Sequence, residues 1–149
     1  MIGTQLLKNC QFDWAGALVT AASSTDSNSS RFDMAGFDGV LFWTTITDCV
    51  SGGVATLKVE ENTADSDTGM TLITGASAAA TSGANDDLNN TLLIVDVYRP
   101  RERYVQGVRV SATQNIAFGE IHAIRYKSRK GPITQSATTV STSTFVVGS

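Results

Sequence analysis

The stretch GVATLKVEE (Gly53–Glu61) decides the fold class, because its side chains alternate between apolar and polar from Ala55 to Glu60. The apolar members are Ala55, Leu57 and Val59, and the polar members between them are Thr56, Lys58 and Glu60. Side chains of a β-strand point to opposite faces in turn, so this period of two predicts a strand with one buried and one solvated face.

Two longer stretches are apolar on both sides of the expected strand: FDGVLFWTTIT (Phe37–Thr47) and NTLLIVDVY (Asn90–Tyr98). In the first, Phe42 and Trp43 are consecutive and therefore face opposite ways. A strand of this kind lies in the middle of a covered sheet or beneath another subunit. Weaker patterns predict further strands at Ala15–Thr20, Ser29–Met34, Met70–Ile73, Arg103–Ala112 and Ile116–Lys127.

Connections between the strands indicate how the sheets are built. The turn SATQN (Ser111–Asn115) predicts a hairpin. A β-bulge is expected near Gly119, because Phe118 and Ile121 share a face only if the strand holds one extra residue. The alanine-rich stretch Ile73–Leu88 is interrupted by Gly, Ser and Thr and is expected to be a loop. About eight strands without a βαβ rhythm indicate an all-β, antiparallel, jelly-roll-like sandwich.

The chain has the size of one domain, and we expect a single β-sandwich over residues 1–131. From Pro132 onward it contains no Asp, Glu, Lys or Arg, and it ends in an apolar group that includes Phe145 and Val147. Residues 132–149 are therefore expected to form an extended arm that pairs with a neighbouring subunit and buries Phe145 and Val147. A disordered terminus is the alternative.

Composition favours a protein that packs against others. Charged residues make up 17% of the chain, below the usual share of about 25%. No apolar run approaches the length of a membrane span, and the first residues lack the apolar core of a secretory signal. Cys10 and Cys49 are expected to be buried free thiols, because cytosolic thiols usually stay reduced. The sequence leaves open whether the two cysteines form a disulfide.

Charge is unevenly distributed along the chain. Residues 1–96 carry three basic and twelve acidic residues, a net charge of −9, whereas residues 97–149 carry eight basic and two acidic residues, a net charge of +6. This asymmetry permits attraction between copies or to an acidic partner, and solvated loops of either sign are the alternative.

No catalytic or metal-binding pattern stands out. His122 is the only histidine and lies within an expected strand, which favours a structural role. One histidine and two cysteines in unrelated segments match no zinc spacing. We therefore expect neither an enzyme nor a bound cofactor.

Four arginines cluster in one segment: Arg99, Arg101, Arg103 and Arg109. A nucleic-acid surface is disfavoured, because the pI is near 5.0 and the rest of the chain would repel phosphates. In the strand Arg103–Ala112, Tyr104 and Val108 share one face and the arginines the other, so the arginines are expected to point away from the core. Their expected use is pairing with carboxylates of another chain, and a solvated face is the alternative.

The same region resembles a family of small structural proteins of tailed-bacteriophage virions. The resemblance covers about 40 residues, YRPRERYVQGVRVSATQNIAFGEIHAIRYKSRKGPITQ (Tyr98–Gln135), and rests on three elements. These are Arg99-Pro100 with Arg103-Tyr104-Val105, then Ala123-Ile124 with Tyr126, and finally Arg129-Lys130 with Pro132. Members of this kind resemble head decoration or cement proteins, and the first 90 residues carry no such likeness.

The resemblance implies a non-enzymatic protein that binds the outside of an assembled capsid. Its expected partners are the major capsid protein and other copies of itself, as a dimer or trimer, with no nucleic acid and no membrane. The expected location is the capsid surface, after synthesis in the host cytoplasm. A glycan-binding β-sandwich of a tail or fibre is the alternative, and a minor tail component is not separable from sequence.

Overall fold

A computed structural model describes residues 5–148 of the chain. Within these residues the chain forms one short helix and nine strands. They are α1 (Leu6–Asn9), β1 (Gln11–Gly16), β2 (Val19–Ala22), β3 (Thr25–Asp33), β4 (Phe37–Cys49), β5 (Val54–Asn62), β6 (Thr71–Thr81), β7 (Thr91–Tyr98), β8 (Tyr104–Ala112) and β9 (Ile116–Ser128).

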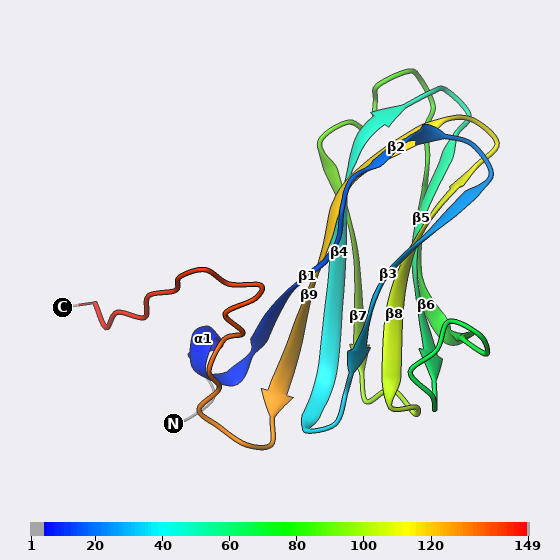
Figure 1. Ribbon diagram of the computed structural model, residues 1–149. Coiled ribbons are helices and arrows are strands. Elements are labelled where there is room, and N and C mark those ends of the chain that lie inside the picture. The colour runs from blue at the N-terminus through cyan, green and yellow to red at the C-terminus, as the bar shows by residue number, and fades with distance from the viewer. Residues whose placement is uncertain (1–4, 149) are drawn as a thin grey trace.

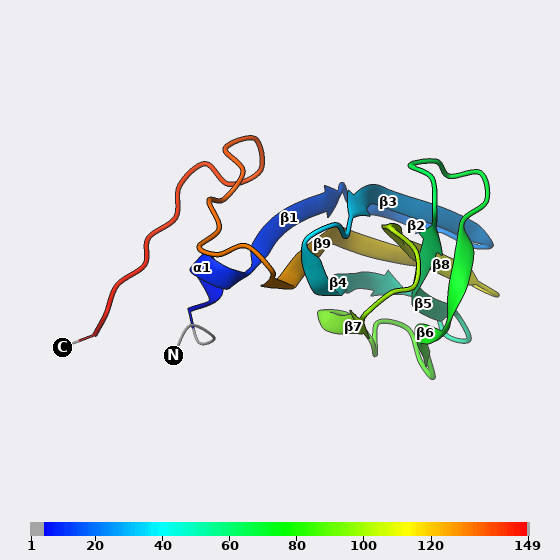
Figure 2. The same ribbon diagram turned by 90° about the horizontal axis from the view of Figure 1, so that it is seen from below.

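The strands build two antiparallel sheets that pack face to face (Figure 1, Figure 2). Sheet A has the order β1-β9-β4-β7, with β2 also pairing with β9, and sheet B has the order β3-β8-β5-β6. This is the strand order of an eight-stranded jelly roll whose first strand is broken into β1 and β2. The predicted antiparallel sandwich is therefore confirmed, and the ninth strand results from the break.

The core lies between the two sheets and follows the sequence alternation. In β5, Ala55, Leu57 and Val59 are fully buried, as their spacing predicts. From sheet A, Phe42 and Phe118 fill the opposite side of the core. Burial of these apolar side chains stabilises the sandwich without a disulfide, and Cys10 and Cys49 are buried free thiols as predicted.

The bulge expected near Gly119 is confirmed by the pairing of β4 with β9. Thr44 lies opposite Ile121 and Ile46 opposite Phe118, so two steps along β4 match three along β9. The extra residue keeps both Phe118 and Ile121 in the core, where they are 2% and 0% exposed.

Arg109 was expected to point away from the core, and this prediction is wrong. Its side chain is 2% exposed, and Nη1 donates to the carbonyls of Ala17 and Gly119, each at 2.7 Å. These carbonyls lie at the break between β1 and β2 and at the bulge of β9, where ladder hydrogen bonds are interrupted. Burial lowers the pKa of Arg109. Arg109 thus satisfies backbone groups that two strand irregularities leave inside the sandwich.

Two other sequence predictions also need correction. The stretch Ile73–Leu88, expected to be a loop, is largely the strand β6. Its small side chains Ala76, Ala78 and Ala80 pack toward the core, so tertiary contacts override a weak local preference. The expected strand Ala15–Thr20 is interrupted between β1 and β2.

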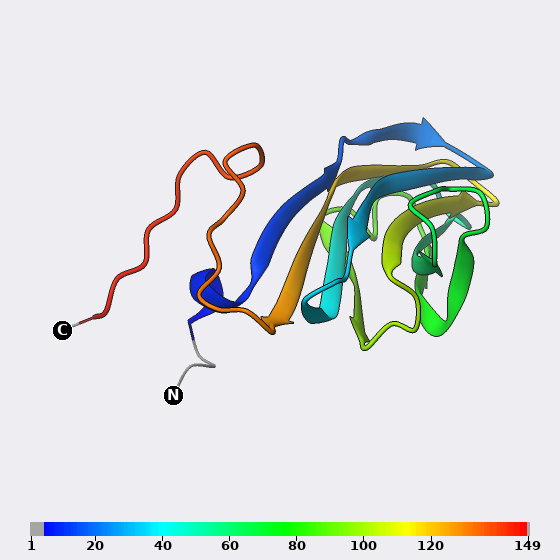
Figure 3. The same cartoon turned by 60° about the horizontal axis from the view of Figure 1, so that its bottom comes forward.

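The chain leaves the sandwich after β9, and residues 129–148 form neither helix nor strand. As predicted, the last strand ends before Pro132, which has no N–H to donate to a ladder. The arm runs past α1 and away from both sheets (Figure 3). Gln135 fixes its beginning, because the side-chain amide donates to the carbonyls of Leu7 at 3.0 Å and Cys10 at 2.7 Å and accepts from the N–H of Phe12 at 3.0 Å.

Candidate binding face

The outer face of sheet A carries rows of apolar and aromatic side chains that no other part of residues 5–148 covers completely. The strand register aligns Tyr126, Gly39 and Tyr98 in one row, Phe12, Ile124, Leu41 and Asp96 in the next, and Trp14, His122, Trp43 and Ile94 in a third. Leu92 follows on β7 beside Thr45. We call this surface the aromatic face.

Exposure is highest along the two margins of the aromatic face. On β7, Leu92 is 56%, Ile94 49% and Tyr98 49% exposed. On β1, Trp14 is 46% exposed. The same alternation along β7 places Leu93, Val95 and Val97 in the core. Both sides of β7 are therefore apolar although only one side meets the other sheet.

The third row holds a stacked pair. The rings of Trp43 and His122 lie 5.1 Å apart at an angle of 19°. The Nε2 atom of His122 is 3.5 Å from a carboxylate oxygen of Glu120. Trp14 pairs with His122 across β1 and β9. Three ring side chains thus lie side by side on three adjacent strands.

The row nearest the end of β9 depends on a glycine. Tyr126 lies across β4 directly over Gly39, where a Cβ atom would overlap the tyrosine ring. From there the Tyr126 hydroxyl donates to the Asp96 carboxylate on β7 at 2.6 Å. Burial, and then the hydrogen bond to Asp96, raise the pKa of Tyr126 above its ordinary value. The bond ties three strands together on the outer surface.

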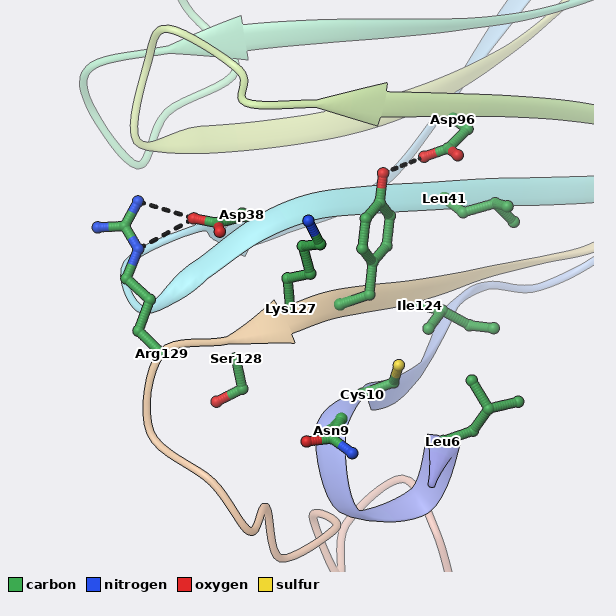
Figure 4. A pocket seen from close by; sticks show the side chains of 11 residues that line it. Leu6, Asn9, Cys10, Asp38, Leu41, Asp96, Ile124, Lys127, Ser128 and Arg129 are labelled. Atoms are coloured by element: carbon green, nitrogen blue, oxygen red, sulfur yellow. Dashed lines mark hydrogen bonds and ion pairs between the residues drawn. The ribbon is translucent and has the colours of Figure 1, made fainter. Parts of the chain in front are cut away.

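A cavity of about 760 Å³ opens beside this row, between α1 and the ends of β4 and β9 (Figure 4). We call it the hollow. Its apolar wall consists of Leu6, Leu41 and Ile124. Cys10 also lines it, and burial raises the pKa of the Cys10 thiol, which disfavours the reactive thiolate.

The charged groups around the hollow are matched within the chain. Arg129 pairs with Asp38 through Nε at 3.0 Å and Nη2 at 2.9 Å. Asp96 accepts the bond from Tyr126, and the Lys127 ammonium lies 5.1 Å from the centre of the Tyr98 ring. The hollow therefore presents an apolar wall and a rim whose charges already have partners.

The outer face of sheet B has a different character. Lys58 lies there between Asp26, at 3.5 Å, and Glu60, at 3.1 Å. Arg31 binds both Asp65 and Asp67, at 2.6 and 2.8 Å. This face is polar and charged, as the alternation of Gly53–Glu61 predicts, so the two outer surfaces of the sandwich are chemically distinct.

The arginine cluster does not act as one surface. Arg103 makes a bidentate bond to Asp33 of its own chain, at 3.0 and 2.8 Å, and its predicted pairing with a carboxylate of another chain stays a prediction. The loop before it is held by Glu61, which accepts from the N–H groups of Arg101 and Glu102. The side chains of Arg99 and Arg101 are exposed, and their role at an interface stays a prediction.

Sequence reasoning selected the arm but missed most of the aromatic face. Phe145 and Val147 are 43% and 76% exposed, which leaves their predicted burial by a neighbour untested. Trp14 and Ile94 were not selected, although the apolar pattern on both sides of Asn90–Tyr98 pointed to the outward side chains of β7.

The described part of the chain offers no recognisable metal site. None of its His, Cys, Asp and Glu side chains gather in a group of three or more that suits an ion. No helix among residues 5–148 is long and apolar enough to cross a membrane.

No family model and no curated protein matches this chain. Among solved structures, the PBSX exported protein XepA is similar over 96% of this chain and 45% of that chain, with a TM-score of 0.53 and 15% sequence identity. The chain thus spans less than half the length of XepA. At this identity the likeness shows a shared fold and nothing of function.

Two further structures are weakly similar. One comes from a report that Bacillus endospore appendages form a family of disulfide-linked pili, with 12% identity, a TM-score of 0.49 and coverage of 81% of this chain and 90% of that chain. The other contains the CBM22-1 and GH10 modules of Clostridium thermocellum xylanase 10B with xylohexaose, with 13% identity, a TM-score of 0.46 and coverage of 89% and 29%. Both likenesses are too weak to bear on function.

Proposed function

We propose that this chain is a non-enzymatic structural protein of a bacteriophage virion, a cement or decoration protein that binds the outer surface of the head and bridges major capsid subunits. The observation that carries the proposal is the aromatic face. A soluble monomer rarely exposes a large contiguous apolar patch, and such a patch marks a contact surface. The resemblance of Tyr98–Gln135 to tailed-phage virion proteins supplies the capsid as the partner.

The composition of the aromatic face favours a protein partner over a sugar. Aliphatic side chains such as Leu92 and Ile94 alternate with the rings, as in the centre of protein interfaces. A sugar-binding site also needs polar side chains that hydrogen-bond to the hydroxyl groups of the sugar and fix its orientation. Two carboxylates lie beside the rings and both have partners in the chain: Asp96 accepts a bond from Tyr126, and Glu120 lies 3.5 Å from His122 Nε2.

Glycan binding by a tail or fibre protein remains a second candidate because of one observation. Trp14, His122 and Trp43 form a row of rings across three strands, and Trp14 is 46% exposed. Sugar rings stack on such surfaces. If this is the function, Trp14→Ala should abolish binding to a soluble polysaccharide, and the purified chain should not bind to particles that lack it.

Copy number in purified particles tests the proposal. Quantitative mass spectrometry should find hundreds of copies per virion for a capsid protein, and a handful would place the protein in the tail and refute the cement role. Particles that lack the protein should take up the purified chain and resist heat better afterwards. Saturable binding to a polysaccharide without binding to particles would favour the second candidate.

A further inference from the structure

We propose that the arm of one copy inserts Phe145 and the residues after it into the hollow of a second copy. The proposal concerns contacts between copies at one end of the aromatic face, where Leu41 and Ile124 line the hollow, and it does not depend on which partner covers the rest of that face.

The arm and the hollow match in chemistry. Residues 132–148 contain no Asp, Glu, Lys or Arg, so the arm brings no charge that would need a partner. The hollow has an apolar wall, and the charges on its rim are paired within the chain. A neutral apolar segment is therefore the occupant that costs least to bury there. A cavity of about 760 Å³ has room for a phenylalanine and neighbouring small side chains.

Within the single chain, the arm does not bury the apolar side chains at its end, Phe145, Val146 and Val147. Phe145 lines only a small recess of about 170 Å³ beside Leu7 and Ile133, and it stays 43% exposed. Val146 and Val147 are 74% and 76% exposed. Uncharged segments of this kind gain stability when another surface covers them.

The helix α1 separates the arm from the hollow of the same chain. Leu6 and Cys10 line the hollow, whereas Leu7 and Lys8 line the recess on the side of the arm. The bonds from Gln135 to the carbonyls of Leu7 and Cys10 hold the beginning of the arm on its own side. The arm therefore begins near the rim of one hollow and points away from it (Figure 1).

The arm is long enough to reach a neighbour. Phe145 lies ten positions after Gln135, and an extended chain over ten residue steps spans up to about 35 Å. Ser128 at the end of β9 and Arg129 just after it also line the hollow, and the arm begins three residues later at Pro132. Two copies that meet at this end therefore bring each arm close to the hollow of the other. A symmetric exchange of this kind closes a dimer, and a rotational one closes a trimer.

Cross-linking between two full-length variants tests the exchange. One variant carries Val146→Cys in the arm, and the other carries Leu6→Cys in the wall of the hollow. The control replaces Leu18, which is 66% exposed against 63% for Leu6 but lies in the connection between β1 and β2. Both variants and the control also carry Cys10→Ser and Cys49→Ser, because Cys10 lines the hollow and its thiol would compete with Leu6→Cys.

After mixing and mild oxidation, Leu6→Cys should give at least about tenfold more covalent dimer than Leu18→Cys, because docking raises the effective concentration of the two thiols. Equal yields would overturn the proposal. So would an intrachain disulfide in the double variant of Leu6 and Val146, since the arm would then fill its own hollow.

Light scattering of the full chain provides a second measurement. The wild-type protein should be at least dimeric at micromolar concentration, and a monomer would overturn the proposal. Phe145→Asp should weaken the oligomer and raise its dissociation constant about tenfold or more, because the substitution places a carboxylate against the apolar wall of the hollow. Ser141→Asp adds the same charge outside the anchor, and an equal effect from it would contradict insertion of Phe145.

Discussion

Gly39 should be intolerant of alanine only while Tyr126 is present. In Gly39→Ala the new methyl group would displace the Tyr126 ring, which supplies the three atoms nearest to that position. The loss comprises a hydrogen bond to a carboxylate, about 1.5 kcal/mol at an exposed site, and about 1 kcal/mol of ring packing. Alanine in place of glycine within a strand returns about 0.5–1 kcal/mol. The net destabilisation is therefore about 1.5–2 kcal/mol.

A double-mutant cycle measured by chemical denaturation checks this reasoning. In the Tyr126→Ala background nothing is left to displace, so Gly39→Ala should stabilise the protein by about 0.5–1 kcal/mol. The same substitution thus changes sign between the two backgrounds, with a coupling energy of about 2.5 kcal/mol. If Gly39→Ala costs the same in both backgrounds, the glycine is needed for its backbone and the packing argument fails.

Three further outcomes follow from the described contacts. Because the folded state raises the pKa of Tyr126, the protein should lose stability as pH rises above the unfolded value near 10, and Tyr126→Phe should flatten that decline in pH-dependent denaturation. Ile94→Asp should weaken binding to particles about 100-fold or more, whereas Leu72→Asp, at 51% exposure on the edge of the other sheet, should bind as wild type in the same sedimentation assay. Arg103→Ala should leave the midpoint of chemical unfolding and particle binding nearly unchanged, because its exposed pair with Asp33 lies within one chain; a binding defect would support an interface role for Arg103.

The strands that could be predicted are those whose side chains alternate cleanly. Gly53–Glu61 shows its buried face by spacing alone, and the bulge near Gly119 follows from two apolar pairs of opposite parity. The pattern on both sides of Phe37–Thr47 was explained by a central strand, which β4 is. Asn90–Tyr98 cannot be explained in the same way, because β7 lies at the edge of sheet A. Its apolar outward side favours the second alternative, a strand that another subunit covers.

The predictions that failed share a physical cause. In β8 the side chains that face the other sheet include Gly107, Arg109 and Ser111. Val108 and Val110 lie on the opposite face, and because they are apolar, the sequence pattern wrongly assigned that face to the core. Gly107 is small because a Cβ atom there would meet Ile121 and Phe42 at 2.8 and 2.9 Å. The role of Arg109 depends on carbonyls from two irregular strands that are distant in sequence. Such non-local packing leaves no periodic signal in a single strand.

The fold does not require the exposed apolar side chains of β7, and this separates folding from function. Leu93, Val95 and Val97 already attach β7 to the core, so the outward Leu92 and Ile94 add little to the stability of one chain. An edge strand with apolar outward side chains also invites unwanted pairing, which proteins usually suppress with charges or cover. On β7 only Asp96 supplies a charge, and it is held by Tyr126. Cover by another protein surface is the remaining solution, which is why the aromatic face, rather than the arginine cluster, carries the proposed function.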